Sequence, residues 1–133
     1  MSLSLYGPRN SRLVSVVDDD ESVRRGLCNL LRSLGYEARD FASGQAFLQS
    51  PHLARTGCLL LDVVMSGMSG PELQRQLRAL GKNFPTIFIT AYVDAATEES
   101  VRQAGAIGFL CKPFSEDALT VLIDSAFAEH GPA

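Results

Sequence analysis

Five short runs of strand-forming residues recur along this chain, and a helical stretch follows each of them. The runs lie at 13–18, 36–41, 58–62, 86–90 and 107–111. Strands that alternate with helices pair in parallel through right-handed crossovers, so the pattern predicts a layered α/β fold. No internal repeat interrupts the alternation.

Differences among the runs predict where each strand lies in the sheet. The runs 13–17, 58–61 and 86–89 are continuously apolar, as strands covered on both faces must be. The segment 36–39 alternates apolar and polar residues instead, which is typical of an edge strand. The helical stretch 95–104 has few apolar residues on one face, so we expect it to be the most loosely held helix.

Several residues mark where helices begin and end. Gly35 and Gly81 follow two apolar-periodic stretches and are expected to end those helices. Ser69-Gly70-Pro71 predicts a helix start, with proline in the first turn. Ser115 is placed to cap the last helix, and Phe114 and Leu119 have the spacing of a hydrophobic staple.

Length and composition narrow the classes of function. The chain has 133 residues, enough for one domain with a proper core, which we expect at 13–128 between a loose leader (1–12) and a tail (129–133). A net charge of -3 offers no basic stripe for nucleic acid. No apolar run approaches the roughly 18 residues of a membrane span.

The cysteines and histidines suggest a cytoplasmic protein without a zinc site. Cys28, Cys58 and Cys111 are odd in number and widely spaced in apolar surroundings, which favours reduced thiols that act as small hydrophobic residues. Cys111, beside Lys112, is the one whose reactivity would be worth testing. The two histidines lack ligand spacing.

Reactive side chains stand at the ends of four of the five predicted strands. The first ends in Asp18-Asp19, the third in Asp62, the fourth in Thr90 and the fifth in Lys112. In a doubly wound sheet, chemistry gathers outside the carboxyl ends of the strands. These groups are therefore expected to share one rim, whereas any one of them alone is more simply a helix start, a turn or a surface charge.

The charges expected at this rim match a magnesium ion. Three aspartates and one lysine leave a formal charge of about -2, and Mg²⁺ prefers carboxylate oxygens. A carboxylate held between Mg²⁺ and a lysine can attack phosphorus, because both cations neutralise charge on the incoming phosphoryl group. Such a transfer needs positioning and charge stabilisation rather than a histidine base.

Four motifs occur in order at fitting intervals. They are Val17-Asp18-Asp19-Asp20-Glu21, Asp62 through Gly70, Ile89-Thr90-Ala91, and Phe109 through Phe114. Together they resemble the receiver domain of two-component response regulators and are most similar to those of nitrogen-fixation-type transcriptional regulators. The resemblance covers roughly 13–128 and implies a flavodoxin-like, doubly wound (βα)5 fold, a five-stranded parallel sheet of order 2-1-3-4-5.

The resemblance also implies a role for each site residue. Asp62 is the expected phosphoryl acceptor. Asp19 is expected to ligate Mg²⁺ directly, Asp18 through a metal-bound water, and the backbone carbonyl of Val64 completes the protein ligands. Lys112 pairs with the acceptor and then with the phosphoryl group, and the Lys112-Pro113 bond is expected to be cis.

Thr90 and Phe109 are the switch residues that the resemblance implies. Thr90 hydrogen-bonds a phosphoryl oxygen, and Phe109 then turns inward, although Phe109 also suits plain core packing. The expected partner is a histidine kinase or phosphotransfer protein, and the face 95–128 is expected to form a homodimer or grip a partner. The chain would catalyse only its own phosphorylation and dephosphorylation, with transcription regulated through a domain outside it.

Other classes of function stay open on the sequence alone. A Mg²⁺-dependent phosphatase with an aspartate nucleophile usually places that residue on the first strand and adds a cap, for which 133 residues leave little room. A flavin-binding domain would need a phosphate loop after the first strand, where the run of acids would repel phosphate. A degenerate receiver that only binds protein is a third alternative.

Two departures from the family pattern bear on the loops around the site. Ser66 stands where proline is most common, so the loop after Asp62 lacks a fixed φ and is expected to be less rigid. Val64 and Tyr92, each two residues beyond a site residue, are bulky and offer no base for water. We therefore expect a long-lived aspartyl phosphate. Asp20 is assigned to capping the first helix rather than to the metal.

Overall fold

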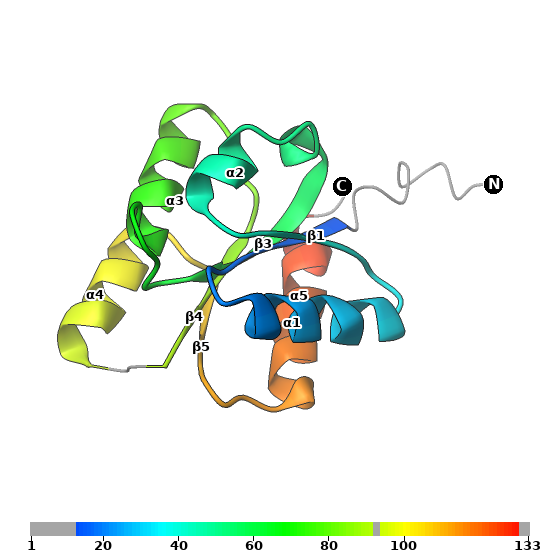
Figure 1. The fold of residues 1–133 in the computed structure, drawn as a ribbon. Coiled ribbons are helices and arrows are strands. Elements are labelled where there is room, and N and C mark those ends of the chain that lie inside the picture. Colours follow the sequence, from blue (N-terminus) through cyan, green and yellow to red (C-terminus); the bar gives the residue numbers. More distant parts are fainter. Residues whose placement is uncertain (1–12, 92–93, 131–133) are drawn as a thin grey trace.

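The strands form one parallel sheet in the expected order. The computed structural model describes residues 13–91 and 94–130. Its five strands are arranged β2-β1-β3-β4-β5 (Figure 1). Their bounds are β1 Leu13–Val17, β2 Glu37–Phe41, β3 Thr56–Asp62, β4 Thr86–Thr90 and β5 Gly108–Cys111. The predicted flavodoxin-like topology and the edge position of the second strand are confirmed.

Helices cover both faces of this sheet. They are α1 Glu21–Ser33, α2 Gly44–Leu48, α3 Gly70–Ala79, α4 Ala95–Gln103 and α5 Glu116–His130, with a 3₁₀ turn at Leu53–Arg55. Helices α1 and α5 lie on one face, and α2, α3 and α4 lie on the other (Figure 1). No helix in the described part of the chain is long and apolar enough to cross a bilayer.

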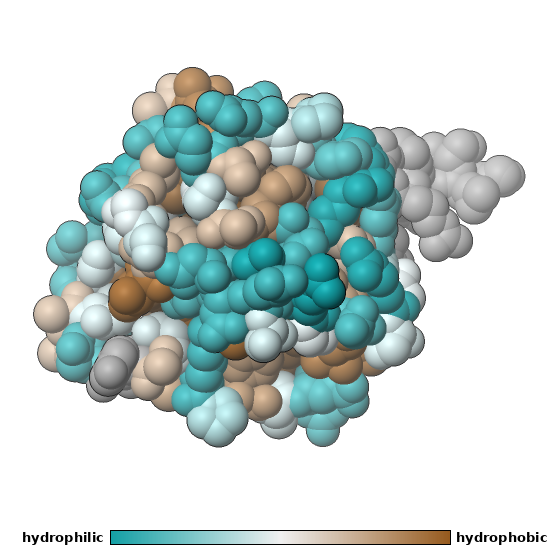
Figure 2. Space-filling model, viewed as in Figure 1, coloured by the Kyte–Doolittle hydropathy of each residue, from teal (hydrophilic) through white to brown (hydrophobic). Residues whose placement is uncertain are grey.

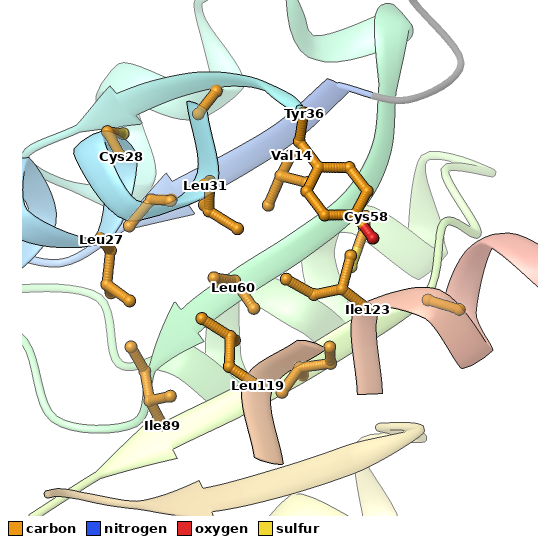
Figure 3. Packing of buried hydrophobic residues seen from close by; sticks show 14 of the residues in the cluster. Val14, Leu27, Cys28, Leu31, Tyr36, Cys58, Leu60, Ile89, Leu119 and Ile123 are labelled. Carbon is orange, nitrogen blue, oxygen red and sulfur yellow. The ribbon is translucent and has the colours of Figure 1, made fainter. Parts of the chain in front are cut away.

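The first core cluster joins α1 and α5 across the sheet. Leu31, Leu60 and Ile123 have no exposed surface, and their side chains meet between the two helices and the central strands (Figure 3). At the edge of the cluster the Tyr36 hydroxyl hydrogen-bonds the Asp124 carboxylate, and the Tyr36 ring stacks on Phe127 at 5.7 Å. These contacts hold α5 firmly beside the sheet.

The second cluster is uneven in how it holds its helices. Helix α3 contributes Leu73 and Leu77, both fully buried, whereas α4 buries only Val101 along its length. The Arg78 guanidinium adds one tie, donating to the Ala104 carbonyl at 3.2 Å beyond the end of α4. Little apolar burial therefore anchors α4, as its sequence predicted.

The predicted helix ends agree with the structure. Asp20 caps α1 by accepting from the Val23 amide, and Ser69 forms a capping box with Glu72 at the start of α3. Ser115 accepts from the Ala118 amide at the start of α5. Local side-chain chemistry thus fixes where the helices leave the strand ends.

The cysteines fit their predicted role only in part. Cys28 and Cys58 are buried, and burial raises their thiol pKa values to about 11 and about 12. Cys111 is exposed, so the expectation of apolar surroundings is wrong there. The cause is its place, since it closes β5, an edge strand with one open side.

Gly70 is required where α3 meets the end of β3, and replacing it with alanine is expected to destabilise the fold. An added Cβ would overlap the Asp62 carbonyl oxygen and lie 3.1 Å from the Val63 Cα, both backbone groups that cannot rotate away. We predict a loss of roughly 2–3 kcal/mol in the free energy of unfolding, measured with urea. In the matched control Gly26→Ala, within α1, the Cβ meets nothing within 4 Å, and a gain of roughly 0.5–1 kcal/mol is expected. Equal effects of both changes would contradict this packing account.

Candidate functional site

Three carboxylates converge at the carboxyl ends of β1 and β3. Oxygens of Asp18, Asp19 and Asp62 all lie within 4.8 Å of one another. Asp18 is fully buried and Asp62 is 7% exposed, whereas Asp19 is exposed. The central strands are hydrogen-bonded neighbours, so their ends bring residues 44 positions apart into one pocket.

Lys112 supplies the positive charge in this pocket. Its ammonium Nζ lies 3.2 Å from Asp18 Oδ2 and 3.4 Å from Asp62 Oδ2. The Lys112 backbone amide donates to the Thr90 carbonyl at 2.7 Å, which fixes the chain as it leaves β5. Burial by itself lowers the Lys112 pKa, but the two carboxylates outweigh it and raise that pKa, so the side chain stays charged.

Burial and a neighbouring carboxylate disfavour the ionised form of the Asp62 carboxyl. Its pKa rises from 3.8 to about 6, first through burial and then through the neighbouring Asp18 carboxylate, while Lys112 and the Val64 amide oppose the rise. Lys112 thus offsets only part of the combined effect of burial and the Asp18 carboxylate.

Asp62→Asn is therefore expected to stabilise the metal-free fold at neutral pH. A raised folded-state pKa means that the protonated carboxyl favours the fold below pH 3.8, and that this contribution is lost as the pH rises through about 6. Asparagine suffers no such loss. In metal-free buffer we expect the variant to gain roughly 1 kcal/mol over the wild type at about pH 7.5, after discounting for solvent, and nothing at about pH 4. Urea unfolding at both pH values measures this, and a gap that does not change with pH would contradict it.

Backbone amides orient each of the three carboxylates. The Asp20 amide donates to Asp18 Oδ1 at 2.9 Å, and the Val64 amide donates to Asp62 Oδ1 at 3.2 Å. The Ser66 amide donates to Asp19 Oδ2 at 2.9 Å. The first two bonds lie within single turns, whereas the third joins two loops.

Arg24 also holds the acidic loop, through contacts that no sequence pattern predicted. Its Nε donates to Asp40 Oδ2 at 2.9 Å and its Nη1 to the Asp18 carbonyl at 3.4 Å. The Asp18 amide in turn donates to the Phe41 carbonyl at 3.2 Å. The end of β2 carries no reactive group of its own, but it supports the loop after β1, which carries Asp18 and Asp19.

The remaining predicted residues lie on β4 and β5, beside the pocket. Thr90 is fully buried at the end of β4, and Phe109, on β5, is partly buried against the second core cluster. Phe88 and Phe109 are register partners across the two strands. Tyr92 lies outside the described residues, and the Lys112-Pro113 bond is cis as predicted.

A groove that no sequence motif predicted lies beside the acidic pocket. It encloses about 340 Å³ between the loop after β3 and the start of α4. Val64, which is 63% exposed, lines it together with Pro71 and Ala96. On the face of the molecule shown in Figure 2, hydrophobic residues gather beside a broad band of hydrophilic residues. The loop that follows Asp62 is thus open to solvent on one side.

The donor set suits a hard divalent cation. Three carboxylates and one ammonium leave a formal charge of -2 when all are ionised. Oxygen donors of this kind suit Mg²⁺. A nearby cation favours the ionised form of a carboxyl such as Asp62, whose pKa is raised by burial and by Asp18. The acidic pocket can therefore bind a metal.

Comparison with known proteins agrees with this geometry. Residues 14–124 match the family model described as response regulator receiver domain. The response regulator protein TodT of Pseudomonas putida is 40% identical over 114 residues, which cover 86% of this chain and 50% of TodT. The transcriptional regulatory protein FixJ of Bradyrhizobium diazoefficiens is 37% identical over 120 residues, 90% of this chain and 58% of FixJ.

Solved structures show the same likeness. The response regulator StyR superposes with a TM-score of 0.81 at 47% identity, covering 89% of this chain and 60% of StyR. The structure titled FixJ-N gives 0.82 at 37% identity, covering 91% and 96%. The chain spans 50% of the length of TodT and 58% of the length of FixJ. With its fold, its acidic pocket and a family match across most of its length, the chain belongs to the receiver domains of two-component response regulators.

Proposed function

We propose that this domain is a phosphorylation switch in which Asp62 accepts a phosphoryl group with Mg²⁺ bound. The observation that carries the proposal is the convergence of Asp18, Asp19, Asp62 and Lys112 in one pocket. Asp19 and the Val64 carbonyl would hold the metal with Asp62, and Asp18 would act through a metal-bound water. The bound ion supplies positive charge to the incoming phosphoryl oxygens.

The proposed transfer replaces one bond to phosphorus with another. A carboxylate oxygen of Asp62 forms a bond to phosphorus as the bond from phosphorus to the donor's histidine nitrogen breaks, and that nitrogen keeps the electron pair. The product is an aspartyl phosphate. Lys112, already 3.4 Å from Asp62, can follow the negative charge from the carboxylate to the phosphoryl oxygens.

Thr90 and Phe109 would convert this charge into a change of shape. A charge-assisted hydrogen bond from Thr90 to the phosphoryl group contributes about 1.5–3 kcal/mol. Movement of Thr90 opens space for Phe109, which is only partly buried and so has room to turn inward. A bias of that size shifts a two-state equilibrium roughly 10–150-fold.

The weakly anchored helix is the element best placed to respond. Helix α4 buries only Val101, in the cluster against which Phe109 of β5 packs, so repacking there costs little apolar contact. The face formed by 95–128 is accordingly proposed to form a homodimer or grip a partner after phosphorylation. A cytoplasmic histidine kinase or phosphotransfer protein would be the donor.

The output is proposed to be control of transcription through a domain outside this chain. TodT is a response regulator and FixJ a transcriptional regulator, and this domain matches only about half of each. The net charge of -3 leaves the domain itself poorly suited to contact nucleic acid.

Labelling with a small phosphodonor tests the proposed function. Incubation of the purified domain with phosphoramidate and Mg²⁺ should add one phosphoryl group per chain, read as a mass increase of the intact protein. The same incubation with excess EDTA should add none. Labelling that is independent of the metal, or no labelling in either case, would overturn the proposal.

The aspartyl phosphate is expected to be long-lived for its class. Val64 is exposed and aliphatic and Tyr92 is bulky, so neither supplies a base that would direct water at phosphorus. Removal of excess donor followed by timed mass spectra measures the decay. A half-life of only seconds would show that another group activates the water.

A further inference from the structure

The peptide groups on both sides of Asp18 are tied to the end of β2. On the amino side, the Asp18 amide donates to the Phe41 carbonyl at 3.2 Å. On the carboxyl side, the Asp18 carbonyl accepts from Arg24 Nη1 at 3.4 Å, and Arg24 Nε donates to Asp40 Oδ2 at 2.9 Å. Asp40 and Phe41 are adjacent residues of β2, so one strand end holds both peptide groups, one directly and the other through Arg24.

The bond from Arg24 acts on both acids of the loop after β1. The Asp18 carbonyl belongs to the planar peptide group that joins Asp18 to Asp19, so its orientation sets the directions in which the two side chains leave the backbone. Asp18 is buried, but Asp19 is exposed, and packing does not fix its carboxylate. The backbone of the loop therefore has to place Asp19.

The contacts of Arg24 indicate a role for its geometry rather than for its charge. Its side chain is only 16% exposed, and the Asp40 carboxylate paired with it offsets the positive charge. Among the described residues, the Arg24 guanidinium hydrogen-bonds Asp40 and the loop backbone but none of the three carboxylates of the pocket. A planar guanidinium donates in fixed directions, which suits it to hold two segments at a set spacing.

We infer that Arg24 is a positioning residue for the acids that hold the metal, an inference that rests on the proposed function. Paired with Asp40, it keeps the loop after β1 in the form that places the Asp18 and Asp19 carboxylates for Mg²⁺ before the ion arrives. Outer groups that orient metal ligands commonly change metal affinity by about 10–100-fold.

Removal of Arg24 distinguishes geometry from charge, because the two roles predict opposite changes in Mg²⁺ affinity. Through charge alone, Arg24→Met would bind Mg²⁺ more tightly, since a positive charge near the ion is lost. Through positioning, the variant should bind more weakly, with a dissociation constant on the order of tenfold higher. Isothermal titration of the full chain measures the difference, and amide NMR spectra that are unchanged away from the loops establish that the variant folds.

The neighbouring arginine provides the matched control. Arg25 lies on the same helix and carries the same charge, but its side chain is 71% exposed and pairs with Glu21. Arg25→Met should bind Mg²⁺ within about twofold of the wild type, because solvent and salt screen its charge. A merely structural Arg24 would lower the free energy of unfolding and leave the affinity of the folded variant unchanged. Wild-type or tighter binding by Arg24→Met, or equal weakening by Arg25→Met, would overturn the inference.

Asp40 should affect Mg²⁺ binding only through Arg24. Asp40→Ala alone should weaken binding several-fold, because Arg24 loses its partner. In the Arg24→Met background the same change should alter affinity by less than about twofold, since residues that act as one unit are not additive. Equal weakening in both backgrounds would show that Asp40 acts independently of Arg24 and would contradict the inference.

Hydrogen exchange provides a metal-free test that does not need a folded Arg24 variant. The Asp18 amide should exchange several-fold faster in Asp40→Ala than in the wild type, because the loop is held less firmly; Asp40 is exposed, so its removal leaves the core intact. Equal exchange in the two proteins would overturn the inference while leaving the proposed function standing. Failure of the wild-type domain to bind Mg²⁺ would instead overturn the proposed function, and the inference with it.

Discussion

Asp62→Asn is expected to abolish phosphoryl uptake while leaving the fold intact. The amide keeps the shape of the carboxyl group but is a far weaker nucleophile, and it cannot form the acyl phosphate. Because the ionised Asp62 is disfavoured in the metal-free fold, with its pKa raised to about 6, the variant should also be at least as stable as the wild type. Intact-protein mass spectra after phosphoramidate treatment measure uptake, and urea unfolding measures stability.

A neighbouring aspartate provides the matched control. Asp20 lies on the same acidic loop but caps α1 by accepting from the Val23 amide. Asparagine caps helices equally well, so Asp20→Asn should be labelled like the wild type. Labelling of Asp62→Asn at the wild-type rate would mean that another carboxylate is the acceptor, and loss of labelling in Asp20→Asn would mean that the capping assignment is incomplete.

Lys112→Met is expected to separate phosphoryl transfer from metal binding. The ammonium lies within 3.4 Å of both Asp18 and Asp62, and its loss removes a charge that would neutralise the phosphoryl oxygens. Uptake should slow by roughly 10²–10³-fold, the typical cost of one electrostatic donor. Mg²⁺ should bind as tightly or several-fold more tightly, because a positive charge has left the pocket.

Lys82, the only other lysine in the sequence, is the control for the charge change. It follows the end of α3 and donates its backbone amide to the Leu77 carbonyl. Lys82→Met should change neither the rate of uptake nor Mg²⁺ affinity. Weaker Mg²⁺ binding in Lys112→Met would indicate that the lysine organises the metal site rather than serving the transferred group.

Much of the fold follows from patterns that act locally. The continuous apolar runs predicted strands covered on both faces, and the alternation of strands with helices predicted parallel pairing. The observed parallel sheet agrees with both predictions. Ser69 and Ser115 lie at their helix starts because capping depends on a few adjacent residues. The shared rim followed in turn, since parallel strands end on the same side.

Contacts between separate segments of the chain could not be predicted from such patterns. Arg24 could have paired with any nearby acid, and its choice of Asp40 depends on how closely the end of β2 approaches α1. Ser66 suggested only a looser loop, but its amide binds Asp19 once both loops are in place. The exposure of Cys111 likewise depends on the open side of an edge strand, which local hydrophobicity does not report.

Titration of the isolated domain with Mg²⁺, followed by ¹H–¹⁵N NMR, tests the central claim most directly. A single saturable transition should shift the amide signals of Asp18, Asp19, Val64 and Lys112 together, because their segments surround one ion. Asp19→Asn, which removes one carboxylate, should require a much higher Mg²⁺ concentration for the same shifts. Spectra that stay unchanged across the titration would show that the three carboxylates do not form a magnesium site, and the proposed switch would lose its basis.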